Sequence, residues 1–395
     1  MEHLVDITRP LRVLVLLACV IVSFLGIAGS SVPAHGCVSC GFQLSWGSSG
    51  RDGGQFYSPQ GVAVDPAGFV YVADQGNNRI EKFTGAGEFV SEWGGLGVRN
   101  GSFSYPYGIA VSPTGLVYVT DYRNGRVEVF TPTGAYFAQW GSEESIRMGF
   151  LVAPTGIAIN ALGDVYVADF YYDFVQKYDG LGNFVLAFGD YGSGQGRFNG
   201  TGDIAVDLSG NVYVTDVGND RVEKFNGNGN YITQWGHRGS RNGEFNFPLG
   251  IAVDSTGSVY VADNGNRRIQ KFTSKGVYVS QWSLTIPGSG QLENPEGLAV
   301  DSLGTVYVTT SENHVERFGE FPITTFTSSE TSASTTTSAE CLSTKCSSAS
   351  SFANSTLSRP LGFYQNVNLG VAAAIVVVVA LSGLLYSLGR SKRQR

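Results

Sequence analysis

The sequence is poor in charged residues, methionine, histidine and cysteine. Asp, Glu, Lys and Arg make up only 15% of its 395 residues, and it contains two Met, four His and five Cys. Two methionines exclude a methionine-rich binding groove, and five cysteines are too few for a dense disulfide scaffold. The net charge of −7 disfavours a nucleic-acid partner, because nucleic acids bind basic surfaces.

Glycine and aromatic residues are abundant instead. The chain contains 53 Gly, and 12% of its residues are aromatic. This composition is typical of many short strands joined by tight turns. We therefore expect an all-β fold.

A regular repeat covers residues 42–318. The strand pattern Val-Tyr-Val-x-Asp recurs every 47 or 48 residues, with Thr in place of Asp in its last copy; the six positions are Asp74, Asp121, Asp169, Asp216, Asp263 and Thr310. Pro-x-Gly before an apolar strand, and Trp or Phe before a small residue, recur with the same period. Periods of 20–50 residues are typical of solenoids and propellers.

Each copy contains four short strands. In the first copy we expect strands at 61–64, 69–73, 79–83 and 88–93, which we name A to D, separated by turns rich in Gly and Asn. These turn residues tolerate positive φ, and alternating side chains fit a half-buried pleat. Four strands per repeat predict one propeller blade.

The number of strands predicts how the ring closes. Six A–C sets are present, and the last ends at Phe318 without a strand D. Residues 42–47 resemble a strand D that has no blade of its own. We expect this segment to complete blade six, which leaves no unpaired edge at the seam. The sequence thus predicts a six-bladed β-propeller over residues 41–320, closed by its N-terminal strand.

The run Asp-x-Gly-Asn-x-Arg-Ile/Val-x-Lys-Phe resembles the NHL repeat. It is found at residues 74–83, 216–225 and 263–272. The resemblance implies a six-bladed propeller. It does not fix the function, since the family includes adhesion, sensing, RNA-binding and lyase proteins.

Residues that recur in register are interpreted as scaffold. The strand-B Asp and strand-C Arg are expected to form turn caps and inter-strand pairs, and the Trp series is expected to pack between blades. The Phe series is interpreted as core: Phe56, Phe103, Phe150, Phe198 and Phe245, with Leu292 sixth. The series Asp65, Asp207, Asp254 and Asp301 begins the A–B turns, where a carboxylate caps the backbone.

Departures from the repeat indicate a binding site. The start of strand A and the end of strand B share one rim, where blades two and three place Tyr107, Tyr122, Phe170, Tyr171 and Tyr172. Clustered exposed aromatic side chains favour a contact surface for a sugar or a peptide. The alternative is that some of these rings fill space left by the Gly-Asn turn that blade three lacks.

The sequence offers little for catalysis, and we predict no cofactor, no metal and no catalytic residue. His237 and His314 lie in different blades, and His314 is assigned to a variable exposed position equivalent to Asn78. Asp203 and Glu296 are expected near the channel mouth, but two acids are too few for a calcium-dependent site. A metal-dependent lyase or hydrolase at the channel remains the alternative to a binding protein.

The chain ends carry targeting patterns. Residues 1–34 resemble a signal peptide, with an uncleaved anchor as the alternative. Residues 367–389 are apolar enough to span a membrane and are followed by a basic tail, 390–395, which predicts a cytoplasmic C-terminus. Between propeller and span, the Ser/Thr-rich residues 321–366 predict a stalk. Asn100, Asn199 and Asn354 fit the N-glycosylation pattern.

Four cysteines flank the propeller. Cys37 and Cys40 precede the closing strand, and Cys341 and Cys346 follow blade six. Outside the cell they would be oxidised, with three connectivities. Our hypothesis is that bridges between the two pairs staple the ring, against local 37–40 and 341–346 bonds. A lipoprotein signal at Cys37 is a weaker rival.

Together these patterns predict a single-pass cell-membrane protein whose propeller is extracellular. We expect a binding, adhesion or recognition module that engages a glycan or a protein through its loop-rich face, with no nucleic-acid partner.

Overall fold

The computed structural model describes residues 41–141, 149–283 and 293–319. The predicted signal peptide, stalk, membrane span and basic tail lie outside these residues, as do Cys37, Cys40, Cys341, Cys346, Asn354 and Leu292. Within the described ranges, no helix is long and apolar enough to cross a membrane.

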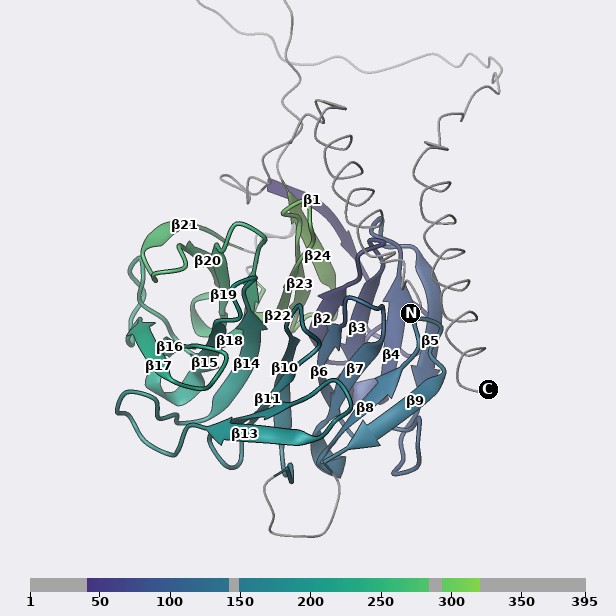
Figure 1. The fold of residues 1–395 in the computed structure, drawn as a ribbon. Coiled ribbons are helices and arrows are strands. Elements are labelled where there is room, and N and C mark those ends of the chain that lie inside the picture. Colours follow the sequence, from purple (N-terminus) through teal and green to yellow (C-terminus); the bar gives the residue numbers. More distant parts are fainter. Residues whose placement is uncertain (1–40, 142–148, 284–292, 320–395) are drawn as a thin grey trace, which may run out of the picture. The chain divides into compact units, whose positions relative to one another are not determined.

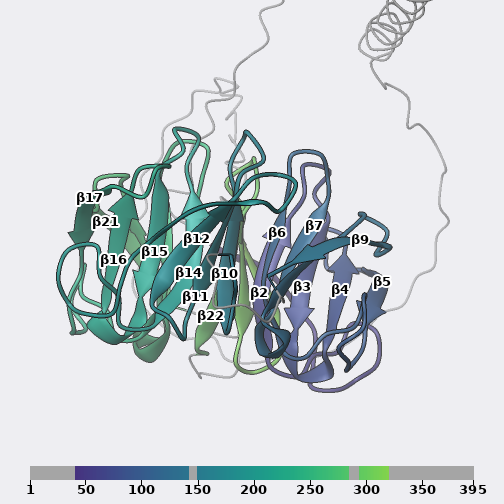
Figure 2. The same cartoon turned by 60° about the horizontal axis from the view of Figure 1, so that its bottom comes forward.

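The described residues form six antiparallel four-stranded sheets, as the repeat predicts. Blade one contains β2 (Pro59–Val64), β3 (Val70–Asp74), β4 (Arg79–Phe83) and β5 (Phe89–Gly94); blade two contains β6 (Pro106–Val111), β7 (Val117–Asp121), β8 (Arg126–Phe130) and β9 (Tyr136–Trp140). Blade three contains β10 (Pro154–Ile159), β11 (Val165–Asp169), β12 (Phe174–Tyr178) and β13 (Phe184–Phe188); blade four contains β14 (Thr201–Val206), β15 (Val212–Asp216), β16 (Arg221–Phe225) and β17 (Tyr231–Trp235). Blade five contains β18 (Pro248–Val253), β19 (Val259–Asp263), β20 (Arg268–Phe272) and β21 (Tyr278–Ser283). Figure 2 shows the outer strands β5, β9, β17 and β21 at the periphery, with β2, β6, β10 and β14 nearer the centre.

Blade six is completed by the N-terminal strand, as predicted. It consists of β22 (Pro295–Val300), β23 (Val306–Thr310), β24 (Val315–Gly319) and β1 (Gly41–Trp46), in the order β1-β24-β23-β22. Phe42 pairs with Phe318 and Trp46 pairs with Val315. Figure 1 shows β1, in purple, beside β24, in green. Since β2 also contacts β22, the ring closes between blades six and one.

The innermost strands approach so closely that glycine is required there. A Cβ on Gly61 of β2 would lie 2.5 Å from the carbonyl oxygen of Tyr107 on β6, and one on Gly250 of β18 would lie 2.5 Å from that of Glu296 on β22. These contacts are with backbone, which has no room to move aside. The Pro-x-Gly motif is therefore a consequence of inter-blade packing.

The core lies between neighbouring blades. The Trp series packs there as expected: Trp93 of blade one contacts both Tyr71 of its own blade and Phe130 of blade two. One member of the Phe series was assigned wrongly. Blade three buries Leu151, 1% exposed, in place of Phe150, which is only partly buried, because the repeat is one residue longer before Pro154.

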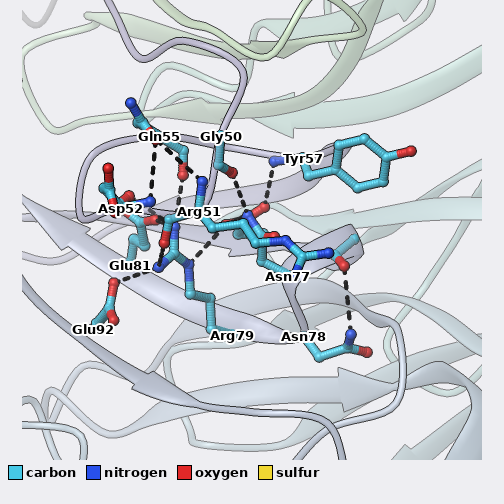
Figure 3. A network of polar contacts seen from close by, with 12 residues as sticks. Gly50, Arg51, Asp52, Gln55, Tyr57, Asn77, Asn78, Arg79, Glu81 and Glu92 are labelled. Atoms are coloured by element: carbon cyan, nitrogen blue, oxygen red, sulfur yellow. Dashed lines mark hydrogen bonds and ion pairs between the residues drawn. The ribbon is translucent and has the colours of Figure 1, made fainter.

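Each regular blade is fastened by a buried arginine network. In blade one, Arg79 Nε donates to Asp74 Oδ2 at 2.9 Å, and its other nitrogens donate to the carbonyl oxygens of Arg51, Asp52 and Gln55. Figure 3 shows these loop residues gathered around the guanidinium of Arg79. The same Asp–Arg pairs recur at 2.6–2.8 Å in blades two, four and five. The predicted scaffold role of these residues is confirmed.

Blades three and six depart from this network in different ways. In blade three Phe174 takes the Arg position, and Asp169 instead accepts the backbone N–H groups of Val152 and Tyr171. In blade six the B–C loop is one residue shorter than in blade one. Asn313, with φ of 66°, therefore takes the position of Asn78, and His314 falls in the Arg position. Our assignment of His314 to an exposed loop position was wrong.

Candidate functional site

The loops before the inner strands and the B–C turns meet at one mouth of the propeller. In four blades the B–C turn is a short 3₁₀ helix: η1 (Gln75–Asn77), η2 (Tyr122–Asn124), η3 (Val217–Asn219) and η4 (Asn264–Asn266). Each turn is anchored to the preceding loop by backbone hydrogen bonds, such as Gly76 N–H to Tyr57 O at 2.8 Å. This packing positions the side chains that depart from the repeat.

Three of the five predicted aromatic residues come together here. Tyr107, Tyr122 and Phe170 line one cavity of about 290 Å³. The ring centroids of Tyr107 and Tyr122 are 6.2 Å apart, and Phe170 is 44% exposed. They form a shared wall on blades two and three.

The other two aromatic residues face elsewhere. Tyr171 and Tyr172 do not line the cavity; their ring centroids lie 5.2 Å apart, and Tyr172 stacks on Phe174 at 5.4 Å. Phe174 is the residue that replaces the arginine of blade three. Tyr172 thus fills space beside a departure from the repeat, which is what the alternative interpretation expected for some of these rings.

The sequence did not indicate two further aromatic side chains of this cavity, Tyr105 and Phe247. Each precedes the proline of a strand A and has a positive φ, 61° and 60°, a conformation that bulky residues rarely adopt. The backbone N–H of Tyr105 donates to Asn78 Oδ1 of blade one at 2.9 Å, and that of Phe247 donates to Asp220 Oδ1 of blade four at 2.8 Å. These inter-blade hydrogen bonds hold the unusual backbone and aim both rings at the mouth. Their signal in the sequence is an Asn or Asp at the end of the preceding blade's B–C turn.

Arg123 lies at the rim of the same cavity. Its guanidinium carbon is 3.7 Å from the centroid of the Tyr105 ring. The aromatic wall thus already makes one cation–π contact.

The floor of the mouth is acidic. Tyr107, Asp203 and Glu296 line a small axial cavity of about 20 Å³, and Tyr107 belongs to both cavities. Asp203 stands where five blades have the close-packed Gly, and its carboxylate accepts the N–H groups of Ile204 at 2.9 Å and Ile251 at 3.1 Å. Burial raises the pKa of Asp203 to about 7 and that of Glu296 to about 7. The predicted position of both acids near the channel mouth is confirmed.

The two histidines do not join this site. His237 is 75% exposed and lies 3.5 Å from Glu244 in a D–A loop, and His314 pairs with Glu293 inside blade six. Within the described ranges, no group of three or more His, Cys, Asp or Glu side chains is placed to hold a metal ion. The glycosylation candidates Asn100 and Asn199 are both exposed.

Comparison with known proteins identifies the repeat. The NHL repeat model matches residues 56–83, 103–130 and 245–272, each running from a buried Phe before strand A to the end of strand C. The chain therefore contains NHL repeats. E3 ubiquitin-protein ligase TRIM71 of Mus musculus is 50% identical over 46 residues, and its Bos taurus counterpart is 48% identical over the same length. The match spans 12% of this chain and about one-twentieth of those relatives.

Solved structures are similar over most of the described residues. A streptogramin B lyase matches 70% of this chain and 96% of its own, with 14% identity and a TM-score of 0.51. A gluconolactonase from Xanthomonas campestris matches 67% and 86%, with 13% identity and a TM-score of 0.51. A protein of unknown function from Bacteroides thetaiotaomicron matches 69% and 74%, with 16% identity and a TM-score of 0.54. At these identities the likeness shows the fold alone.

Proposed function

We propose that the chain is a binding module that engages a protein or a glycan at the aromatic mouth of its propeller. The observation that carries this proposal is the shared cavity lined by Tyr105, Tyr107, Tyr122, Phe170 and Phe247. Rigid aromatic rings provide a large contact area at little entropic cost, and they are enriched where proteins recognise ligands.

The backbone of the mouth supports the same proposal. Two of its rings stand on residues with positive φ that neighbouring blades hold in place. Strain of this kind is common at ligand sites, where it preorganises the contacting groups. The mouth is thus preformed by the scaffold.

The setting of this module is also part of the proposal. The apolar residues 367–389 and the signal-like residues 1–34 support display of the propeller outside the cell by a single C-terminal span. Protease treatment of intact cells tests this: an epitope inserted in the propeller is removed, and one at the C-terminus is protected. Protection of both epitopes on intact cells contradicts it.

A site-specific crosslinker tests the binding face. Photo-reactive p-benzoyl-phenylalanine at Phe170 reports contacts of the mouth, and the same group at Leu208, in the A–B turn at the opposite end of the strands, serves as the matched control; both side chains are exposed. We expect a partner to be captured from Phe170 only. Capture from Leu208 alone places binding on the other face.

A glycan array tests the carbohydrate arm. Phe170→Ala and Tyr122→Ala should each abolish binding of any glycan recognised by the full-length chain, whereas Tyr171→Ala should not, because Tyr171 does not line the cavity. Glycan binding that survives the first two substitutions contradicts a site at the mouth.

A further inference from the structure

The two acids on the floor of the mouth differ from the four buried Asp residues of the arginine networks. Asp74, Asp121, Asp216 and Asp263 each pair with an arginine within 2.9 Å. Asp203 is held only by backbone N–H groups, and Glu296 accepts one amide N–H, from Asn264 at 3.3 Å. Among the described residues, neither acid forms an ion pair. The floor therefore carries two desolvated carboxyl groups without a counter-charge.

The walls above these carboxyl groups are aromatic faces. Tyr107 joins the two levels, since its side chain lines both the axial cavity and the larger one. Aromatic faces carry negative electrostatic potential and attract cations, most strongly where water is excluded. The contact of Arg123 with the Tyr105 ring at 3.7 Å shows that the wall accepts a cation at its rim.

The geometry points to a site for an ammonium group on a short apolar stem. We propose that the ammonium charge sits on the floor beside Asp203 and Glu296, and that the stem lies against the rings of Tyr107, Tyr122 and Phe170. The larger cavity, about 290 Å³, is at the lower end of the usual range for ligand sites. This proposal rests on the proposed function, because it names the group that the mouth receives. A lysine side chain of a partner protein and a free alkyl amine share this chemistry.

A neutral ligand fits these features less well. A sugar hydroxyl would leave the two carboxyl groups without a counter-charge, so their ionisation would remain costly. A cation instead favours the ionised form of both. Binding near pH 7 should therefore release protons, because burial has raised the pKa of each carboxyl to about 7.

Titration calorimetry on the full-length chain tests the site with n-butylammonium and its neutral counterpart n-butanol. We expect butylammonium to bind at least tenfold more tightly. Asp203→Asn and Glu296→Gln should each weaken it at least tenfold, and Asp190→Asn, which removes an exposed carboxylate elsewhere, should not. Thermal melts confirm that each variant folds. The binding heat in buffers of different ionisation enthalpy should show the proton release.

Peptides distinguish the two sources of the ammonium group. A blocked tripeptide with a central Lys that binds more tightly than butylammonium, while its norleucine counterpart does not bind, assigns the site to a protein partner. If butylammonium binds and the Lys peptide does not, the site is assigned to a free amine. Equal binding of butanol, or full affinity in both carboxyl variants, overturns the proposal. If a glycan binds at the mouth and butylammonium does not, the binding function stands and the ammonium site is wrong.

Discussion

Glu293 Oε1 lies 3.4 Å from His314 Nδ1, so blade six contains a Glu–His pair, whereas blades one, two, four and five contain Asp–Arg pairs. Glu293 is 2% exposed. It comes from the loop before β22, and His314 falls in the Arg position before β24. The negative charges of Glu312 and Glu316 also raise the pKa of His314. Among the six described blades, the one that is built from both ends of the propeller thus contains a titratable pair in its core.

This pair predicts a pH-dependent stability. The contact with Glu293 raises the pKa of His314 above its usual value, so its contribution is complete below pH 6.5 and is lost as the pH rises through the folded pKa. Burial raises the pKa of Glu316 from 4.5 to about 7, so the free energy of unfolding also falls between about pH 4.5 and pH 7, mostly below the range in which His314 acts. Burial alone would raise the pKa of Glu293, but the contact with His314 lowers it below its usual value. The contribution of Glu293 to stability is therefore lost only at acidic pH.

Urea unfolding between pH 5 and pH 8.5 measures this dependence. We expect the free energy of unfolding to fall as the pH rises over this range, with the contribution of Glu316 lost up to about pH 7 and that of His314 lost above pH 6.5. His314→Gln should flatten the curve above pH 6.5, and the exposed His237→Gln should leave it unchanged. A His314→Gln curve parallel to the wild type contradicts the role of the pair.

The arginine networks predict that removing a buried arginine side chain lowers the free energy of unfolding far more than removing an exposed one. Arg221→Ala leaves Asp216 and Glu223 buried without their counter-charge, so the free energy of unfolding should fall by about 3–5 kcal/mol. Arg197 and Asp190 form an exposed pair at 3.7 Å, and Arg197→Ala should change it by less than about 0.5 kcal/mol. Equal losses in the two variants argue against the buried network as the main fastening.

The close approach of the innermost strands predicts that their glycine positions do not tolerate a side chain. Gly250→Ala places its Cβ 2.5 Å from Glu296 O, so blades five and six must separate, and we expect a loss of at least about 2 kcal/mol in thermal or urea unfolding. The Cβ of Gly194→Ala meets only Cδ of Arg197, at an ordinary contact distance of 3.6 Å, and this variant is the matched control. A neutral Gly250→Ala would mean that the inner strands are more loosely packed than described.

Closure by β1 predicts a strong effect of Trp46. Its ring packs between Phe83 of blade one and Tyr307 of blade six, so Trp46→Ala should cost about 3–5 kcal/mol. Phe137→Ala removes a 62% exposed aromatic side chain from an equivalent outer strand and should have little effect.

Deletion of residues 41–46 should expose the edge of β24 and promote self-association, which light scattering would detect. A stable monomeric deletion variant would contradict closure through β1.

The sequence alone was sufficient for the fold because every blade repeats the same local requirements. The Asp–Arg pairs, the inner Gly residues and the Trp series are needed at each inter-blade junction, so they recur with the period and could be counted. The unmatched segment 42–47 predicted the closure, since an unpaired edge is unfavourable. Assignment of residues by the period gave wrong positions where a blade has one residue more or one residue fewer than the others. The longer stretch before Pro154 led to Phe150 in place of Leu151, and the shorter loop of blade six hid His314 in the Arg position.

The mouth was decided by tertiary structure. The repeat indicated where Tyr107, Tyr122 and Phe170 stand, since all three lie at the rim of neighbouring blades. It could not show that Tyr172 stacks on Phe174, because this contact depends on side-chain direction. Nor could it show that Tyr105 and Phe247 face the mouth, since their positive φ is held by hydrogen bonds that their N–H groups donate to the preceding blades. The pattern of the sequence thus determined the ring, whereas contacts between blades determined which side chains gather over the acids at its centre.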